Sequence, residues 1–589
     1  MLPERHFTIT SSDPEALVSV RYLSGGEDLS VYRVSVRFPD VRTPKPVTVA
    51  WAEDMVNVLY TGKPCCAADH AMRQKWAANR SPSRFCFGAP LLYTVGRDGL
   101  NAETVAVSDP ETPLTVEYYV DDFPQKYEVG YAVVFFDGMC NPIDRYEADI
   151  RIDRRKLPYY ECVRSVYPWW TEYGYVIPPI PAAAEDPLYS SWYNFHQTPV
   201  ADRLLRDLEI AADLGFCTVI LDDGWQFEDK PRLGDYSKCG DWQVAQDKFP
   251  DFKGFVDSLH KRGLKLLVWF TVPFVGIECE AFERFRGKYL DSDPLGSGSL
   301  WQTLDPRYPE VRAFILGGYE RFLRDYDIDG FKLDFIDSFR PGNLTQPYDP
   351  ALMDCVTVDE AVKRLLTEIV DGLGRIKQDL LFEYRMNYVG PAVNRYGNML
   401  RVGDCAYDAL VNRMILVDLR LLNYPVAVHS DMLYWSREES PLLCARQLLN
   451  IFFSVPQISV ILADSTGEQQ AVLRRYLDYW TANRDVILHG DFRPHHPEMN
   501  YSDVTAEGDD KIITVLYADV PVTFTGKPCD VFACKEGDGV TLRNDAPVPL
   551  TAVLYDCFGN VTDMGTAAPG AFLRLPVTEC GMAELRPAE

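Results

Sequence analysis

The sequence has little positive charge for its length. It carries 59 Lys and Arg against 86 Asp and Glu, a formal net charge of −27. Such an excess of negative charge repels phosphate backbones and anionic membranes, and the sequence shows no basic stripe that nucleic acid could follow. The charge balance therefore excludes nucleic acid as a partner and favours neutral or cationic ligands.

Long apolar runs are also missing. No stretch reaches the roughly 18 apolar residues that a membrane-spanning helix needs. The opening MLPERHFTIT lacks the charged start and apolar core of a secretory signal. We therefore expect no membrane association and a cytoplasmic location.

Metal-binding and disulfide patterns are absent as well. The 15 cysteines show neither CxxC pairs nor the Cys/His spacing of a zinc site, and their number is odd. This distribution is typical of buried thiols in a reducing compartment. We expect no metal, no cofactor and no structural disulfide.

Three patterns follow one another along the 589 residues, which exceed what one hydrophobic core usually organises. Residues 1–176 contain short alternating runs, such as YRVSVRF and VTVAWA, that predict an N-terminal β-sandwich. The proline-rich segment 177–187 predicts a linker between this domain and the next. Alternation returns in residues 491–589, which predict a C-terminal antiparallel β-domain, again a β-sandwich.

Between residues 188 and 490, short apolar strands alternate with longer helical segments, the pattern of βα units around a parallel sheet. We expect helices at 202–215, 309–326, 359–374 and 468–485. We expect strands at 189–194, 217–223, 264–270, 330–336, 379–384, 399–404, 426–430 and 458–463. Eight such strands predict a closed (β/α)₈ TIM barrel as the central, catalytic domain.

Polar residues gather where the expected strands end, and the carboxyl ends of barrel strands line the active site of this fold. They are Asp222, Asp223, Lys332, Asp334, Glu383, Arg385 and Asp404. A single acid at a strand end is often only a helix N-cap, but here four strands contribute. Carboxylates with Lys, Arg and Trp fit hydrolysis of a neutral sugar, which needs one carboxyl to donate a proton and a second to act as base or nucleophile.

The barrel motifs are specific and occur in a fixed order. They are LDDGW (221–225), GDW (240–242), KFP (248–250), VWF (268–270), LDPRYPEVR (304–312) and YDIDGFKLDFID (326–337). This series resembles the family 36 glycoside hydrolases of the melibiase clan, mostly α-galactosidases, and the resemblance covers roughly residues 188 to 589.

The resemblance implies the two catalytic roles. Asp334 corresponds to the nucleophile of the family's K-x-D motif, and Lys332, on the same face of the strand, would bind a sugar hydroxyl. The segment GDCAYDALVNR (403–413) is similar to the family's S-D-x-T-D segment with one residue inserted, which implies that Asp404 is the general acid/base. Asp408 is the lesser candidate, and the alternative for it is support of the helix or of Arg413.

The resemblance also implies the walls of a sugar pocket. Two acids would accept hydrogen bonds from the 4- and 6-hydroxyls of galactose, three tryptophans would form aromatic walls unless they are plain core, and one arginine would contact the sugar. These residues are Asp222, Asp223, Trp225, Trp242, Trp269 and Arg284.

The chain departs from the family's pattern after the fifth strand. Arg385 and Tyr388 replace a Cys and a Gly of a turn that lies against the 2-hydroxyl in the family. Two bulky groups there must narrow the pocket or contact a substituent at C2. The alternative is that Arg385 pairs with a local acid and never meets substrate.

The resemblance thus implies a retaining exo-α-galactosidase acting on a neutral α-linked glycoside through a covalent glycosyl-Asp334, with carboxylates about 5 to 5.5 Å apart. Asp404 must start protonated, and partial burial beside Asp334 should raise its pKa. The alternatives are an α-N-acetylgalactosaminidase or another α-glycosidase, an α-galactosyl transglycosylase, and a non-catalytic carbohydrate-binding protein. A homo-oligomer is left open.

Overall fold

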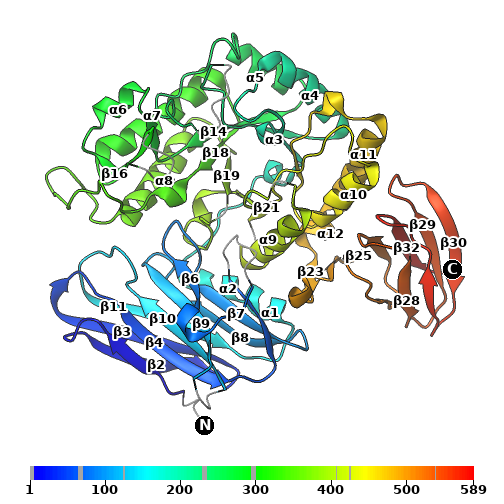
Figure 1. The fold of residues 1–589 in the computed structure, drawn as a ribbon, viewed down its shortest axis with the longest axis horizontal. Helices are drawn as coiled ribbons and strands as arrows, with labels where there is room; N and C mark the ends of the chain where they lie inside the picture. Colours follow the sequence, from blue (N-terminus) through cyan, green and yellow to red (C-terminus); the bar gives the residue numbers. More distant parts are fainter. Residues whose placement is uncertain are drawn as a thin grey trace.

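The structure is a computed structural model that describes residues 5–63, 70–123, 127–228, 235–292, 300–385, 387–405, 407–423, 426–537 and 539–588. Antiparallel sheets, a ring of helices around parallel strands, and a second group of sheets follow one another along the chain (Figure 1). The expected multidomain architecture with a central barrel is confirmed.

Two antiparallel sheets form the N-terminal part. One has the order β1 (Thr8–Ser11), β4 (Val47–Asp54), β10 (Glu128–Phe135), β9 (Leu114–Asp121) and β6 (Asn79–Ser83). The other has the order β2 (Leu17–Gly25), β3 (Leu29–Arg42), β11 (Ile143–Asp153), β8 (Asn101–Val107), β7 (Leu91–Gly96) and β5 (Val58–Gly62). Alternate residues of both sheets, among them Val34 and Val49, pack into one apolar core.

Two short helices follow these sheets, within a region for which the sequence indicated strands. They are α1 (Tyr159–Arg164) and α2 (Val166–Thr171). Consecutive bulky residues bury one helical face, and the indole of Trp170 donates a hydrogen bond to the carbonyl of Val107 at 2.8 Å. This packing overrides the period-2 pattern.

The eight expected barrel strands are all present and all parallel. Their order is β12 (Leu188–Ser190), β13 (Thr218–Leu221), β14 (Lys265–Thr271), β18 (Gly330–Asp334), β19 (Leu381–Arg385), β20 (Met399–Arg401) and β21 (Ala427–His429), with β22 (Gln457–Ile458) beside β12. A bridge between His429 and Val455 brings the two edges together and nearly closes the barrel. Several strands are shorter than expected. The first ends at Ser190, because residues 192–195 form helix α3 (Trp192–Phe195).

The four expected helices are confirmed. They are α4 (Ala201–Leu214), α7 (Pro309–Tyr326), α8 (Val358–Gly374) and α11 (Gly467–Ala482), and they belong to the ring around the strands in Figure 1. Gly215 ends α4 with a φ of 97°, which a side chain would disfavour. The ring also includes α5 (Phe252–His260), α9 (Ala409–Leu422) and α10 (Pro441–Asn450), and α12 (Arg484–His489) follows α11.

An excursion after β14 forms a small sheet of its own. It comprises β15 (Phe274–Gly276), β17 (Trp301–Leu304) and β16 (Tyr289–Asp291), together with helix α6 (Glu280–Arg284). Because it leaves the barrel at the carboxyl end of β14, it lies at the end of the barrel where active sites form.

The C-terminal part consists of two further sheets. The larger has the order β23 (Asp491–His495), β24 (Asp503–Glu507), β25 (Ile512–Leu516), β27 (Cys529–Ala533), β32 (Met582–Pro587), β29 (Leu550–Tyr555) and β30 (Val561–Ala567). The smaller contains β26 (Val522–Phe524), β28 (Val540–Asn544) and β31 (Phe572–Leu575). The larger sheet is mainly antiparallel, with one parallel pair, β25 and β27; the smaller combines a parallel pair, β26 and β28, with an antiparallel pair, β28 and β31.

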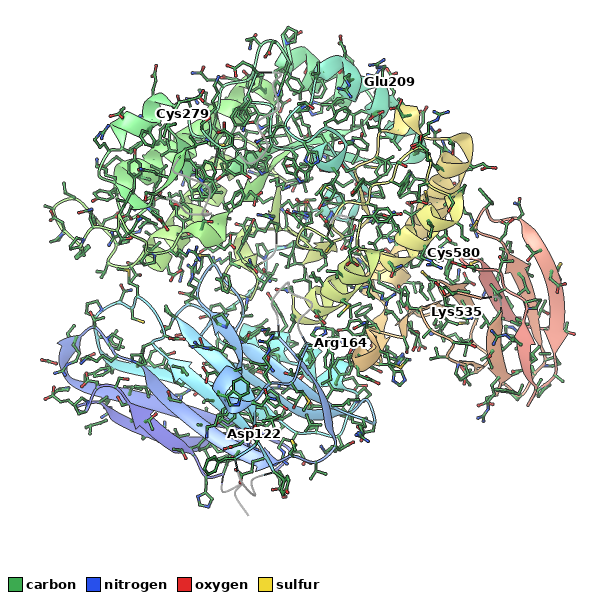
Figure 2. The ribbon with its side chains drawn as sticks, viewed as in Figure 1. Asp122, Arg164, Glu209, Cys279, Lys535 and Cys580 are labelled. Carbon is green, nitrogen blue, oxygen red and sulfur yellow. The ribbon has the colours of Figure 1, made fainter. Side chains whose placement is uncertain are left out.

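Ion pairs and hydrogen bonds connect the three parts, and two of the residues involved, Arg164 and Cys580, are labelled in Figure 2. The guanidinium of Arg164 in α1 lies 2.8 Å from the carboxylate of Asp491 in β23. The phenol of Tyr476 in α11 donates to the carbonyl of Cys580 at 2.8 Å. Among the helices within the described ranges, none is long and apolar enough to cross a membrane.

Candidate active site

The strand register places the candidate catalytic residues in two layers inside the barrel. Trp269 of β14 is opposite Lys332 of β18, which is opposite Glu383 of β19. One step towards the carboxyl ends, Asp334 follows Lys332 by two residues, and Arg385 is opposite Arg401 of β20. Because alternate residues of a strand share a face, these side chains all point inwards.

Asp334 lies at the end of β18 and is 5% exposed. Its Oδ1 accepts from Nε of Arg385 at 2.5 Å and from the backbone N–H of Phe335 at 2.8 Å, and its Oδ2 accepts from the indole of Trp269 at 2.9 Å. Burial alone would raise the pKa of this carboxyl, but the charges of Arg385 and Lys332 and these hydrogen bonds hold the pKa below its ordinary value. The expected nucleophile is therefore an ionised carboxylate in a fixed orientation.

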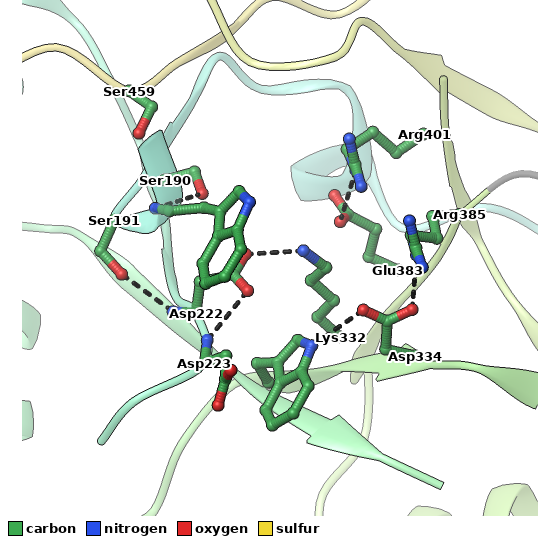
Figure 3. A network of polar contacts seen from close by, with 12 residues as sticks. Ser190, Ser191, Asp222, Asp223, Lys332, Asp334, Glu383, Arg385, Arg401 and Ser459 are labelled. Atoms are coloured by element: carbon green, nitrogen blue, oxygen red, sulfur yellow. Dashed lines mark hydrogen bonds and ion pairs between the residues drawn. The ribbon is translucent and has the colours of Figure 1, made fainter. Parts of the chain in front are cut away.

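Arg385 connects the two candidate catalytic acids, and Figure 3 shows its contact with the first of them, Asp334. While its Nε binds Asp334, its Nη1 lies 3.2 Å from Oδ2 of Asp404. The guanidinium also lies over the ring of Phe335, 4.9 Å from the ring centroid. The alternative that Arg385 pairs with a local acid thus matches its geometry, and the acids it pairs with are the two expected to do the chemistry.

Asp404 lies just beyond β20, and its side chain is 49% exposed. In addition to Arg385, it accepts from Nη2 of Arg401 at 2.9 Å. Burial would raise the pKa of this carboxyl, but Arg401 and Arg385 outweigh burial and hold the pKa well below its ordinary value. The expected raised pKa of Asp404 is wrong, because two guanidiniums, one on each oxygen, face the carboxylate.

Arg401, which the sequence analysis missed, is the buried centre of this charge cluster. Its side chain is 1% exposed, and it forms ion pairs with Asp404, with Asp431 in the segment after β21, and with Glu383 at 3.8 Å. Glu383 is fully buried and accepts from the amide of Gln457 at 2.5 Å. Burial raises the pKa of Glu383 to about 7, against the lowering effect of Lys332 and Arg401.

The adjacent acids Asp222 and Asp223 occupy different surroundings. Asp222 is paired with Lys332, 2.6 Å from its Nζ, and its backbone N–H donates to the hydroxyl of Ser191. Asp223 instead accepts from Gln226 at 2.8 Å and from Gln197 at 2.5 Å. Burial raises the pKa of Asp223 to about 7. Only Asp222 is thus tied directly to the Lys332 layer.

Of the three expected aromatic walls, the structure brings only Trp269 to the acids. Trp225 is fully buried, with its indole donating to the carbonyl of Trp269 at 3.0 Å and its ring packed on Phe270 and Phe322. Trp242 stacks on Trp225, with ring centroids 5.9 Å apart. Trp242 therefore reaches Asp334 only through the ring of Trp269, which its edge contacts.

Arg284 lies away from the charge cluster. It ends α6, and its guanidinium lies over the rings of Phe285 and Phe314. It lines a cavity outside the barrel strands together with Trp242 and Tyr326. The structure does not bring it to Asp334, because α6 belongs to the excursion after β14 and packs against α7 at this point.

Tyr388 and Asp408 both bind backbone groups and so support the fold around the site. The phenol of Tyr388 is 1% exposed and donates to the carbonyl of Leu333 at 2.9 Å, so it holds the residue before Asp334. Asp408 is the N-cap of α9 and accepts from the backbone N–H of Val411 at 3.0 Å. Asp408 therefore takes the helix-supporting role that was its alternative.

Aromatic residues that the sequence analysis did not select complete the wall beside Asp334. Tyr236 stacks on Trp269 with ring centroids 6.0 Å apart, and Phe335 meets Tyr236 edge-on at 5.5 Å. Phe335 has a φ of 62°, a conformation unusual for an aromatic residue, directly after Asp334. The ring of this strained residue lies under the guanidinium of Arg385, and its backbone N–H donates to the carboxylate of Asp334.

The N-terminal part supports the same region from outside. Arg84 donates to the carbonyls of Asp337 and Phe339 and pairs with Asp359 at 2.6 Å. The N–H of Gly88 donates to the carbonyl of Asn387 at 2.6 Å, in the turn after β19. Within the described residues, no group of three or more His, Cys, Asp or Glu is arranged to hold a metal ion.

Comparison with known proteins agrees with the barrel motifs. Residues 185–384 match the family model Melibiase. The chain is 33% identical over 201 residues to "Alpha-galactosidase Mel36A" of Lactobacillus acidophilus, a segment that covers 33% of this chain and 26% of that protein. It is 26% identical over 212 residues to "A type blood alpha-D-galactosamine galactosaminidase" of Flavonifractor plautii, which covers 33% of this chain and 18% of that protein. The match thus spans about a quarter or less of these relatives.

Solved structures extend the likeness of fold to the whole chain. The family 36 α-galactosidase AgaA of Geobacillus stearothermophilus, as a variant in complex with 1-deoxygalactonojirimycin, has a TM-score of 0.67 at 14% identity and covers 98% of this chain and 82% of its own. The α-galactosidase of Lactobacillus brevis has a TM-score of 0.65 at 14% identity and covers 99% and 85%. Residues 185–384 thus resemble the melibiase family in sequence. The fold of the chain is similar to that of the family 36 α-galactosidases.

Proposed function

We propose that the chain is a retaining α-glycoside hydrolase that removes terminal α-galacto-configured sugars, as an exo-acting α-galactosidase does. The observation that carries this proposal is the pair Asp334 and Asp404, which lie at the ends of barrel strands and within reach of one guanidinium. Relatives named α-galactosidases, and AgaA variants solved in complex with raffinose and stachyose, support the substrate class.

The chemistry needs two steps. Asp334 attacks the anomeric carbon while Asp404 gives a proton to the departing glycosidic oxygen, which leaves a glycosyl ester on Asp334. Water then attacks the same carbon, gives its proton to Asp404, and releases the sugar with its configuration retained. The donors of Arg385, Trp269 and Phe335 keep Asp334 ionised and oriented for the first step.

The Lys332–Asp222 pair would bind sugar hydroxyls beside the nucleophile. Both groups are almost fully buried, and each satisfies the other at 2.6 Å, so the pair is held in place before substrate arrives. A vicinal diol can accept from the ammonium and donate to the carboxylate. This arrangement supports a polyhydroxylated glycone.

A second candidate, α-N-acetylgalactosaminidase, follows from Arg385. Its donors lie beside the acids, where an amide carbonyl on the sugar could accept from them. The relative from Flavonifractor plautii is named a galactosaminidase. The two candidates differ only in the substituent that the glycone carries.

The test is release of nitrophenol from the p-nitrophenyl α-glycosides of galactose, N-acetylgalactosamine, glucose and xylose. We expect the galacto-configured substrates to be cleaved and cleavage to be lost in Asp334→Ala and Asp404→Ala. The matched control is Asp408→Asn, which keeps the helix cap and should keep the activity. Cleavage of the glucoside or xyloside alone, or full activity in Asp334→Ala, would contradict the proposal.

We also propose a cytoplasmic location. The cysteines that the structure describes are all free thiols, and most are buried. Burial raises the pKa of several of them, such as Cys355 to about 12, which keeps them protonated and unreactive. Such thiols suit a reducing compartment.

A further inference from the structure

Arg385 is held in one orientation, and among the described residues its Nη1–Nη2 edge has one hydrogen-bond partner, Asp404. Its Nε is bound to Asp334 and its plane lies over Phe335, so the orientation of the fork is fixed. Nη1 makes one bond of 3.2 Å to Asp404, and Nη2 forms no hydrogen bond with any described residue. The Nη1–Nη2 edge is the geometry that carboxylates and sulfates accept in a bidentate way.

The same contact obstructs the proposed chemistry. A general acid must carry a proton and face the glycosidic oxygen, but Oδ2 of Asp404 faces Arg385 and Oδ1 faces Arg401. A hydroxyl group of a neutral sugar replaces a carboxylate poorly as the partner of a guanidinium, since hydrogen bonds between two charged groups are roughly twice as strong as neutral ones. An oxyanion on the sugar replaces it well.

We propose that Arg385 is the specificity-determining residue of this site and that it selects an α-glycoside whose glycone carries an oxyanion, a carboxylate or a sulfate, bound by the Nη1–Nη2 edge. The inference rests on the proposed hydrolase function and narrows its substrate class. In the complex, Nε stays on Asp334, and Nη1 leaves Asp404 for the substrate.

This exchange also prepares the acid. The charged groups that face Asp404 are Arg401 on its own strand, Arg385 on β19, Lys332 on β18 and, through Arg401, Asp431 after β21. When the substrate's negative charge neutralises Arg385, the pKa of Asp404 rises, and the carboxyl takes up a proton from solvent. Asp404 gives this proton to the glycosidic oxygen as the ester on Asp334 forms. The water that then attacks the ester gives a proton back to Asp404.

The experiment compares three p-nitrophenyl substrates on the full chain: the α-galactopyranoside, the α-galactopyranosiduronic acid and the 2-O-sulfo-α-galactopyranoside. The variants are Arg385→Ala and Arg385→Lys. The control is Arg286→Ala, which removes a surface arginine paired with Glu283. Circular dichroism checks that each variant is folded.

We expect kcat/KM of the wild type to be at least about 10-fold higher for one charged substrate than for the neutral one, from the strength of charge-assisted hydrogen bonds. Arg385→Ala should lower kcat/KM for that substrate about 10- to 100-fold more than for the neutral substrate, which loses only the support that Arg385 gives to Asp334. Arg385→Lys should restore part of the preference, because it keeps the charge but loses the fork. Which charged substrate is preferred identifies the oxyanion as carboxylate or sulfate.

A wild type that prefers the neutral substrate, or an Arg385→Ala variant that slows all three substrates equally, would overturn the inference. If no substrate is cleaved, calorimetry with free galacturonate, galactose 2-sulfate and galactose decides. Selective binding of a charged sugar that Arg385→Ala loses would keep the assignment of Arg385 while the hydrolase proposal fails. If no charged sugar binds selectively, both the assignment of Arg385 and the hydrolase proposal are contradicted.

Discussion

The Nε of Arg385 lies 2.5 Å from Oδ1 of Asp334, and the same guanidinium contacts Asp404 at 3.2 Å. One cation therefore stabilises the ionised form of both acids. The proposed chemistry needs Asp334 ionised but Asp404 protonated, so Arg385 helps the nucleophile and opposes the acid. Asp334, Arg385, Asp404 and Arg401 thus form one continuous ion-pair cluster.

Removal of Arg385 should move the pH–activity profile to higher pH. Arg385 lowers the pKa of Asp334 and of Asp404, so Arg385→Ala raises both. The rising limb, set by ionisation of Asp334, and the falling limb, set by loss of the proton from Asp404, should then both shift upwards. The measurement is kcat/KM against pH with the neutral p-nitrophenyl α-galactoside. An unchanged profile would show that Arg385 does not face the acids in solution.

Replacement of Trp269 by Phe should slow catalysis without unfolding the barrel. Phe keeps most of the contact with Tyr236 but loses the N–H that donates to Asp334 at 2.9 Å. A hydrogen bond to a charged group contributes about 1.5–3 kcal/mol, so we expect kcat/KM to fall about 10- to 100-fold. The control is Trp480→Phe, which loses a comparable bond to the carbonyl of Phe452 far from the acids. Equal loss of activity in both variants would assign the effect to stability.

Glu383 should make the protein less stable as the pH rises. Its folded pKa is about 7, above the ordinary value of 4.5, so the folded state binds the proton more tightly. Below about pH 4 the carboxyl therefore does not lower the free energy of unfolding. Its ionisation lowers this free energy increasingly as the pH rises, by about 3 kcal/mol at pH 7. Glu383→Gln should gain stability relative to the wild type between pH 5 and pH 8 in urea unfolding. A difference that stays constant with pH would contradict the raised pKa.

Much of the fold could be predicted from the sequence, because local patterns determine it. Each barrel strand is a short apolar run between turn residues, and alternation along β18 correctly placed Lys332 and Asp334 on one face. The helices α1 and α2 were missed because their residues are apolar on consecutive positions, which suits a strand as well as a helix.

The surroundings of the candidate site could not be predicted, because they come from contacts distant in the sequence. Trp225 follows the end of β13, where strand alternation no longer sets direction, and packing on Phe322 turns it into the core. Arg401 looks like a surface residue until Asp431, 30 positions later, is placed against it. The guanidiniums of Arg401 and Arg385, which the fold places against Asp404, explain why the pKa of Asp404 was predicted in the wrong direction.

The central claim is that Asp334 is the nucleophile of a retaining mechanism. The most direct measurement is mass spectrometry of peptides after reaction with a 5-fluorinated α-galactosyl fluoride, and with its uronic acid form, because the fluorine slows hydrolysis of the glycosyl ester. The account predicts a label on the peptide that contains Asp334 and none in Asp334→Ala. A label on Asp404, or cleavage of an α-glycoside with inverted configuration and no labelled peptide, would contradict it.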